Sequence, residues 1–142
     1  MLVAEILKDK GDAVFSIEPD VSVAEAARVL AARRVGALFV CEGDRVAGVV
    51  SERDAVRAIA QDGPASLGRA VTDYMSVEVV YAQPGDTMAD VMARMTDRRI
   101  RHLPVLRDQR LCGVVSIGDV VKCQIAEATQ EADSLRTYIA AG

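Results

Sequence analysis

The feature that most constrains this chain is an internal duplication. The stretch GVVSERD, Gly48–Asp54, recurs as GVVSIGD at Gly113–Asp119, an offset of 65 residues. The offset holds upstream without a gap and places Pro84 on Pro19 and Leu103 on Leu38. Self-similarity at one fixed period indicates that a chain folds as copies of a single unit. The sequence therefore predicts two equivalent units, each with the same strand-to-helix junction.

Each copy is predicted to contain a strand, a helix, two further strands and a second helix. Runs of β-branched and aromatic residues bounded by turn residues indicate the strands, and Ser22 followed by Glu25 is typical of a capping box at a helix start. In the first copy we expect these elements at residues 13–17, 22–34, 36–41, 46–50 and 51–61. In the second copy we expect them at residues 78–82, 87–99, 101–106, 111–115 and 116–128.

The predicted fold class is α/β, or α+β, with two β-α-β-β-α repeats related by a pseudo-two-fold axis. We expect repeat 1 at residues 1–62, a linker at 63–70, repeat 2 at 71–128 and a helical tail at 129–142. One unit of this size buries too little surface to be stable alone, so the two units should cover each other. The amphipathic tail either packs on its own module or docks on a dimer mate or a regulated partner.

Charge and composition exclude several classes of function. The 17 basic and 21 acidic residues are interleaved, with a net charge of −4, so direct binding to nucleic acid is not expected. No apolar run is long enough to span a bilayer and the start contains acidic residues, so we predict no membrane segment, no signal peptide and a cytoplasmic location. Cys41, Cys112 and Cys123 are expected to be small buried hydrophobes, and the single His102 has no cluster of metal ligands spaced around it.

The duplicated motif, Gly-hydrophobic-hydrophobic-Ser-x-x-Asp at the last strand-to-helix turn of a β-α-β-β-α unit, resembles that of the cystathionine β-synthase (CBS) domain pair, or Bateman module. The stretch RHLPV, Arg101–Val105, is a second mark of that family. The likeness covers nearly the whole chain, so it implies a stand-alone CBS pair. It further implies a non-catalytic, regulatory sensor of energy or redox state that binds AMP, ATP or NAD(H) in two clefts between the repeats and assembles as a homodimer.

The chemistry of the junction residues agrees with such a site. A Ser at the mouth of a helix places a hydroxyl and free backbone N–H groups where an anion is favoured, and a carboxylate one turn later accepts hydrogen bonds from a ribose. Adenine needs an apolar slot with backbone groups at its edge. The resemblance implies a first cleft lined by Ser16, Ile100, Arg101, His102, Pro104, Ser116, Ile117, Gly118 and Asp119. It implies a second cleft lined by Val35, Gly36, Ala37, Ser51, Arg53, Asp54 and Tyr81.

Two departures from the family pattern make the clefts unequal. Tyr81 stands where the family usually has a small hydroxyl residue, and it is expected to fill part of the second cleft. Gly36 and Ala37 stand where the second copy has Arg101 and His102, which together with Arg53 are the expected phosphate partners. The cleft with Asp119 is therefore ranked first.

Simpler interpretations compete with this one. The two Ser-x-x-Asp junctions are also explained as helix caps, and capping can coexist with ligand binding. Arginines at positions 33, 34, 98 and 99 suit helix ends, and Met88, Met92 and Met95 suit core or interface packing. An interaction module with vestigial clefts that regulates a partner enzyme is the alternative function. No catalytic motif appears, so an enzyme is not expected.

Overall fold

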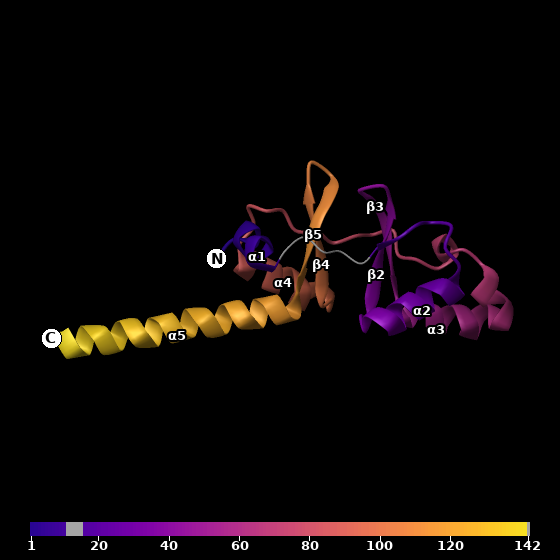
Figure 1. The fold of residues 1–142 in the computed structure, drawn as a ribbon. Helices are drawn as coiled ribbons and strands as arrows, with labels where there is room; N and C mark the ends of the chain where they lie inside the picture. The colour runs from indigo at the N-terminus through magenta and orange to yellow at the C-terminus, as the bar shows by residue number, and fades with distance from the viewer. Residues whose placement is uncertain (11–15, 142) are drawn as a thin grey trace.

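The computed structural model describes residues 1–10 and 16–141, which form two neighbouring lobes and one long projecting helix (Figure 1). The fold class is α+β, as predicted. The first lobe contains β1 (Ser16–Ile17), α2 (Val23–Arg33), β2 (Ala37–Glu42), β3 (Arg45–Ser51) and α3 (Glu52–Asp62). The second contains α4 (Met88–Arg98), β4 (His102–Arg107), β5 (Arg110–Ser116) and the start of α5 (Ile117–Ala141). The remaining elements are α1 (Val3–Lys10) and two 3-10 turns, η1 (Gly63–Gly68) and η2 (Val71–Asp73).

The first repeat forms a three-stranded sheet in the order β1-β2-β3, with β1 parallel to β2 and β3 antiparallel to it. Ser22 caps α2 by accepting a hydrogen bond from the backbone N–H of Glu25. Apolar residues on one face of α2 pack with the strands, and the core contains Ala26, Leu30, Leu38, Val40, Val50 and Val71. The predicted first strand began at residue 13, and its residues 13–15 lie outside the described residues.

The second repeat departs from the prediction, because residues 78–82 do not form a strand. Its sheet has two strands, β4 and β5, and only Ala82 forms a single parallel bridge, to Val105. This bridge matches the pair Ile17 and Val40 in the first repeat. A second bridge, from Tyr81, would need a donor N–H from residue 104. Pro104 has none, so the ladder stops after one rung.

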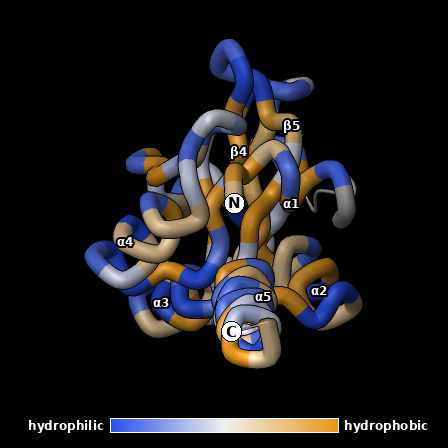
Figure 2. Tube along the Cα trace, turned by 90° about the vertical axis from the view of Figure 1, so that its left-hand side faces the viewer, coloured by the Kyte–Doolittle hydropathy of each residue, from blue (hydrophilic) through white to orange (hydrophobic). Residues whose placement is uncertain are grey.

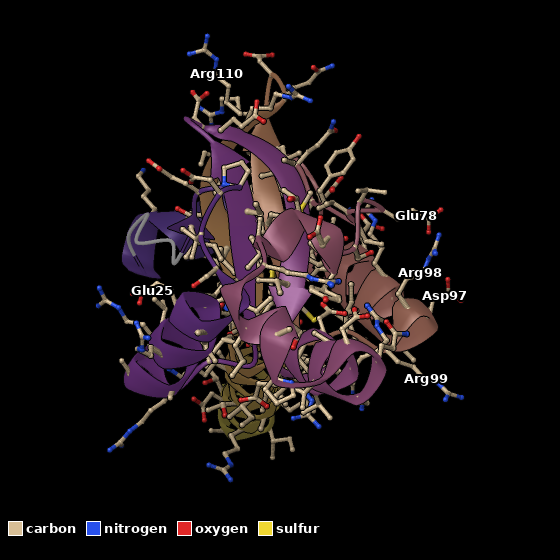
Figure 3. The ribbon with its side chains drawn as sticks, turned by 90° about the vertical axis from the view of Figure 1, so that its right-hand side faces the viewer. Glu25, Glu78, Asp97, Arg98, Arg99 and Arg110 are labelled. Carbon is tan, nitrogen blue, oxygen red and sulfur yellow. The ribbon has the colours of Figure 1, made fainter. Side chains whose placement is uncertain are left out.

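The helix ends follow the duplication closely. Arg34 and Arg99 both end their helices in the left-handed conformation, with φ angles of 55° and 54°. Thr87 and Asp90 form a complete capping box at the start of α4. Figure 3 shows Arg98 and Arg99 pointing outward at the end of α4, which agrees with the prediction that these arginines lie at a helix end. Met88 and Met95 are buried in the core of the second repeat, which agrees with the interpretation that they pack in a core.

Each repeat is completed by the segment that precedes the other repeat. Helix α1, which precedes the first repeat, packs into the second core through Val3, whose N–H donates to the carbonyl of Asp86 at 2.9 Å. The segment 71–76, which precedes the second repeat, packs into the first core through Val71, whose N–H donates to the carbonyl of Val21 at 2.9 Å. The two leading segments are therefore exchanged, and this exchange ties the lobes together.

The lobes also meet at the tips of their two hairpins. The N–H of Leu111 donates to the carbonyl of Asp44 at 2.8 Å, and the guanidinium of Arg110 lies 3.3 Å from the carboxylate of Asp44. Figure 3 places Arg110 at this end of the molecule. Because the hairpins run side by side, the strand-to-helix junctions of both repeats lie at the same, opposite end of the sheets (Figure 1).

The predicted helix at 116–128 and the predicted tail at 129–142 are one continuous helix, α5, of 25 residues. It leaves the second lobe and extends well beyond it, and Figure 2 looks along it from its far end. Within residues 1–10 and 16–141, every helix is too short or too polar to cross a lipid bilayer.

Candidate functional site

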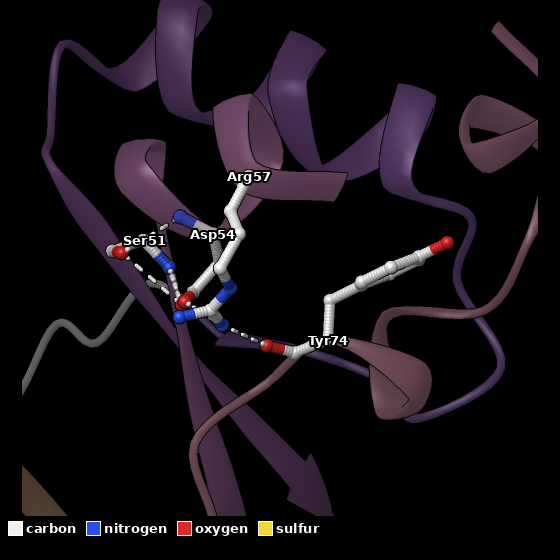
Figure 4. A network of polar contacts seen from close by, with 4 residues as sticks. All are labelled: Ser51, Asp54, Arg57 and Tyr74. Carbon is white, nitrogen blue, oxygen red and sulfur yellow. Dashed lines mark hydrogen bonds and ion pairs between the residues drawn. The ribbon is translucent and has the colours of Figure 1, made fainter. Parts of the chain in front are cut away.

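The first junction lies where β3 ends and α3 begins. Ser51 is the N-cap of α3 and Asp54 is its third residue, and the two form a complete capping box (Figure 4). The N–H of Ser51 donates to Oδ2 of Asp54 at 2.8 Å, and the N–H of Asp54 donates to Oγ of Ser51 at 3.2 Å. The hydroxyl of Ser51 also donates to the same carboxylate at 3.1 Å. The capping interpretation of this junction is confirmed.

Arg57 holds the other oxygen of the same carboxylate. Its guanidinium donates to Oδ1 of Asp54 at 2.8 Å and to the backbone carbonyl of Tyr74 at 3.1 Å, as Figure 4 shows. Asp54 is 8% exposed, so its charge is compensated mainly by these contacts. The Arg57 contact ties α3 to the exchanged segment that follows the linker. Sequence reasoning missed Arg57; its only signal was the three-residue spacing from Asp54 on a helix.

The second junction repeats this geometry where β5 ends and α5 begins. The N–H of Ser116 donates to Oδ2 of Asp119 at 2.8 Å, and its hydroxyl donates to the same oxygen at 3.0 Å. The N–H of Asp119 donates to Oγ of Ser116 at 3.3 Å. Asp119 is more exposed than Asp54, and Lys122 occupies the position that matches Arg57.

The structure brings each junction next to the strand that precedes it. Ala37 pairs with Ser51 across the first hairpin, and His102 pairs with Ser116 across the second. The first amide of each helix donates to a carbonyl just before that strand, from Glu52 to Gly36 at 3.0 Å and from Ile117 to Arg101 at 2.8 Å. The predicted backbone groups and the predicted Ser and Asp side chains therefore share one end of each repeat.

Comparison with known proteins decides the family. The model of the CBS domain matches residues 3–61 and 71–126, which is most of the chain. The chain belongs to the CBS-domain family. It is 34% identical to the CBS domain-containing protein CBSX3, mitochondrial, of Arabidopsis thaliana, over 99% of this chain and 72% of that protein.

Solved structures agree with this membership. The CBS-domain containing protein ATU1752 from Agrobacterium tumefaciens is 42% identical to this CBS pair, with a TM-score of 0.80 over 87% of this chain and 99% of the other. The CBS domain protein PAE2072 from Pyrobaculum aerophilum, solved in complex with AMP, is 28% identical, with a TM-score of 0.72 over 84% and 89% of the two chains. The predicted tandem CBS pair is confirmed.

Other predicted ligand contacts of the CBS pair lie on the strands, on α3 and after the caps of α2 and α4. Pro104 is fully buried, Ser16 is exposed on β1, and Arg53 is exposed on α3. Val35 and Ile100 follow the helix caps, where their N–H groups close the last turns of α2 and α4. The contacts of these residues with a ligand, and those of Gly118, stay predictions.

Tyr81 is 45% exposed and lines a surface hollow together with Asp86 and Arg94, and its place in the cleft with Ser51 and Asp54 stays a prediction. Its carbonyl accepts a hydrogen bond from Arg94 at 3.2 Å, and Arg94 also donates to Asp86 at 2.6 Å. The hydrogen bond from Arg94 holds the pKa of the Asp86 carboxyl below its usual value. This cluster stabilises the turn before α4.

The thiols of the two buried cysteines, Cys41 and Cys123, have raised pKa values. Burial raises the pKa of the thiols of Cys41 and Cys123, and the nearby carboxylates of Asp44 and Glu127 raise them further. A thiol with a raised pKa is a poor nucleophile and a poor metal ligand near neutral pH. No three His, Cys, Asp or Glu side chains in the described part of the chain gather as a metal site requires.

Proposed function

We propose that this protein is a non-catalytic regulatory module that binds an adenine nucleotide, AMP, ATP or NAD(H), between its two CBS repeats. The observation that carries the proposal is the pair of matched junctions, in which a Ser hydroxyl and an Asp carboxylate lie together at the start of a helix in each repeat. The cleft with Asp119 binds first, and the cleft with Asp54 binds more weakly.

The chemistry of each junction supports a ribose contact. An ionised carboxylate accepts hydrogen bonds and donates none. It therefore suits the two adjacent hydroxyls of a ribose, which can both donate to it. Each Asp already receives bonds from its Ser, yet a carboxylate has about four lone-pair sites and retains capacity for a diol. The AMP complex of the Pyrobaculum relative supports a ligand of the adenosine class.

The Arg57 contact supports the ranking of the two clefts. A ribose at Asp54 must share or displace a guanidinium that lies 2.8 Å from the carboxylate and is also anchored on the carbonyl of Tyr74. Asp54 is also the more buried of the two carboxylates. Both features lower the affinity of that cleft for a diol.

Regulation follows if the nucleotide binds one relative pose of the repeats better than another, because only such differential affinity shifts a conformational equilibrium. The exchanged leading segments give a route for the signal, since a movement of one repeat displaces a segment that completes the other. The homodimer and the cytoplasmic location remain predictions; the Arabidopsis relative is described as mitochondrial.

The test is calorimetric titration of the full chain with AMP, ATP, NAD and NADH, and with GTP as the non-adenine control. Asp119→Asn removes the charge while an amide oxygen still accepts the Ser116 N–H, so the cap survives. We expect it to weaken binding of the preferred ligand about 10- to 100-fold, because a hydrogen bond to a charged group contributes ~1.5–3 kcal/mol. Asp54→Asn should affect only a second, weaker binding event.

Asp90→Asn is the matched control. Asp90 forms the same capping box with Thr87, but at the start of α4, away from both junctions. Asp90→Asn should change helix-cap stability as little as Asp119→Asn does and should leave ligand affinity unchanged. Equal binding by the unaltered chain and Asp119→Asn would disprove the ribose contact. Bound ATP or NAD recovered chemically altered after long incubation would disprove the non-catalytic assignment.

The second candidate function is an interaction module with vestigial clefts. The apolar side chains exposed on the helices favour it, notably Val56 and Ile59 on α3 and Ile125 on α5, which are 66%, 47% and 62% exposed. It predicts no heat of binding with any adenosine compound and a partner whose binding is unaffected by nucleotide.

A further inference from the structure

The far part of α5 stands clear of the rest of the chain. Only Val120 and Cys123, near its start, are buried, and every residue from Gln124 to Ala141 is exposed. Past Gln124 and Glu127, which contact the second lobe, Figure 1 shows the helix extending beyond that lobe. An isolated helix of this kind gains nothing from tertiary packing and is marginal in water unless something covers its apolar face.

The exposed apolar residues of α5 form one stripe, which we call the seam. Its members are Val121, Ile125, Ala128, Ala132, Leu135 and Ile139, spaced alternately by four and three residues. The four large ones are 46%, 62%, 62% and 73% exposed, in chain order. Alternating steps of four and three average 3.5 residues, which is the repeat of a coiled coil and not of a helix that packs on a globular core. The occupant that this pattern fits is another helix.

The body of the protein leaves the seam open. Val120 and Cys123, which anchor α5 on its own lobe, lie on the side of the helix away from the seam. Gln124, which donates to Met92, and Glu127, which pairs with the N-terminal amine, mark the flank that faces the lobe. The contacts with the lobe therefore lie beside or behind the seam and leave its large side chains exposed.

The charged residues beside the seam favour a second copy of the same helix as the partner, in the parallel direction. In a parallel pair of identical helices, Glu131 faces Arg136 of the partner, five residues further on, twice by symmetry. In the antiparallel alignment that stacks the same seam residues, Glu131 faces Glu131 and Lys122 faces Arg136, which are like charges. Arg136 is exposed and its contact with Asp133 in its own helix is loose, at 3.8 Å, so it can turn to a partner.

We propose that residues 121–139 of α5 form a parallel, in-register, two-stranded coiled coil with the same segment of a second copy of this chain. The small residues Ala128 and Ala132 let the two helices approach closely at the centre, and the larger seam residues close the two ends. The pairing extends past the CBS repeats and does not depend on nucleotide, so its test is independent of the proposed function.

The first experiment is disulfide cross-linking of the full chain. Two parallel, in-register helices bring position 135 of one copy opposite position 135 of the other, within the Cα separation of ~4.4–6.8 Å that a disulfide requires. Leu135→Cys should therefore form a covalent dimer under mild oxidation. Thr137→Cys, on the outer side of the helix, and the unaltered chain with its own three cysteines are the controls and should stay uncross-linked.

A mixture of Ile125→Cys and Leu135→Cys chains tests the direction. Cross-links between unlike chains with none in Leu135→Cys alone would overturn the parallel arrangement, and no cross-link in any mixture would overturn the coiled coil. A second experiment exchanges the charges beside the seam in chains that carry Leu135→Cys. Glu131→Arg alone should weaken the dimer about tenfold, because it turns two exposed ion pairs into repulsions between like charges. Mixing it with Arg136→Glu should give mainly mixed dimers, and a random mixture would contradict the proposed contact.

Discussion

The exchange of leading segments makes a quantitative prediction at two matched glycines. Gly48 on β3 faces the segment 71–76, and a Cβ there would lie 2.7 Å from the carbonyl oxygen of Ser76 and 2.7 Å from the sulfur of Met75. Gly113 on β5 is its duplicate and faces α1, where a Cβ would lie 2.6 Å from one methyl group of Leu7. The first neighbour is backbone and the second is the end of a flexible side chain.

We expect Gly48→Ala to destabilise the fold by about 2–4 kcal/mol. Forced overpacking costs ~1–3 kcal/mol, and displacing Ser76 also disturbs its two hydrogen bonds with Val49, worth ~1 kcal/mol. Those bonds are both 2.9 Å long. Gly113→Ala should cost less than about 1 kcal/mol, because Leu7 can change rotamer and because alanine stiffens the unfolded chain by ~0.4–1 kcal/mol.

Thermal unfolding followed by circular dichroism measures both variants. For a chain of this length each kcal/mol shifts Tm by about 3 °C, so Gly48→Ala should melt roughly 6–12 °C lower and Gly113→Ala within about 3 °C of the unaltered protein. Equal shifts for the two variants would refute the reasoning, because both glycines lie at matched positions before Val-Val-Ser and the exchanged segments that face them differ. A fall for Gly113→Ala alone would contradict the expectation that the side chain of Leu7 yields more easily than the backbone of Ser76.

The ion pairs of Arg57 with Asp54 and of Arg94 with Asp86 give two further predictions. Arg57→Met should raise the affinity of the second cleft for the nucleotide about threefold in an Asp119→Asn background, because it removes a competing ion pair of ~0.2–1 kcal/mol; calorimetry that shows weaker binding would mean that Arg57 contacts the ligand. Arg94→Met should lower stability by about 1 kcal/mol at pH 7. Since Arg94 lowers the pKa of Asp86 in the folded state, that loss should fade as the pH falls through the lowered pKa, and a loss that persists in acid would contradict the pairing.

Much of the fold could be predicted because its signals are local. The helix starts at Ser22, Ser51 and Thr87 each follow from a side chain that bonds an amide three residues on, and the structure has helices from these caps. The hairpins follow from apolar runs around short polar turns. These features need only a few consecutive residues, so a single sequence contains them in full.

The predictions of secondary structure failed where an element depends on a contact with a residue far away in the sequence. The predicted strand at 78–82 has the right composition, but Pro104 removes the N–H that a second rung needs. Helix α1 was not predicted, and no pattern within residues 1–10 says that it packs on the second repeat rather than the first. Because the two copies present similar faces, the choice between them depends on the connection and not on the sequence of either face.

In the candidate site, too, contacts between residues close in sequence could be predicted and contacts between distant residues could not. Ser51 with Asp54 and Ser116 with Asp119 were predicted because each pair spans three residues, and the structure brings each pair together. The contact of Arg57 with the carbonyl of Tyr74 joins a side chain to a backbone group 17 residues away. Backbone carbonyls carry no sequence signal, so a contact of this kind appears only in three dimensions.

The two junctions have nearly the same hydrogen bonds, so the residues that differ between them are informative. Each Asp makes the same three hydrogen bonds with its Ser, two through the carboxylate and one through its backbone N–H, so the cap alone does not explain why Arg57 and Lys122 differ at matched positions. What differs is the segment beside each junction: α3 is tied through Arg57 to the exchanged segment, at Tyr74. A nucleotide that draws Asp54 away from Arg57 would loosen that tie and free the segment that leads into the second repeat. Under the proposed function, the cleft with Asp54, which we expect to bind more weakly, is therefore the one whose occupancy we expect to be coupled to the other repeat.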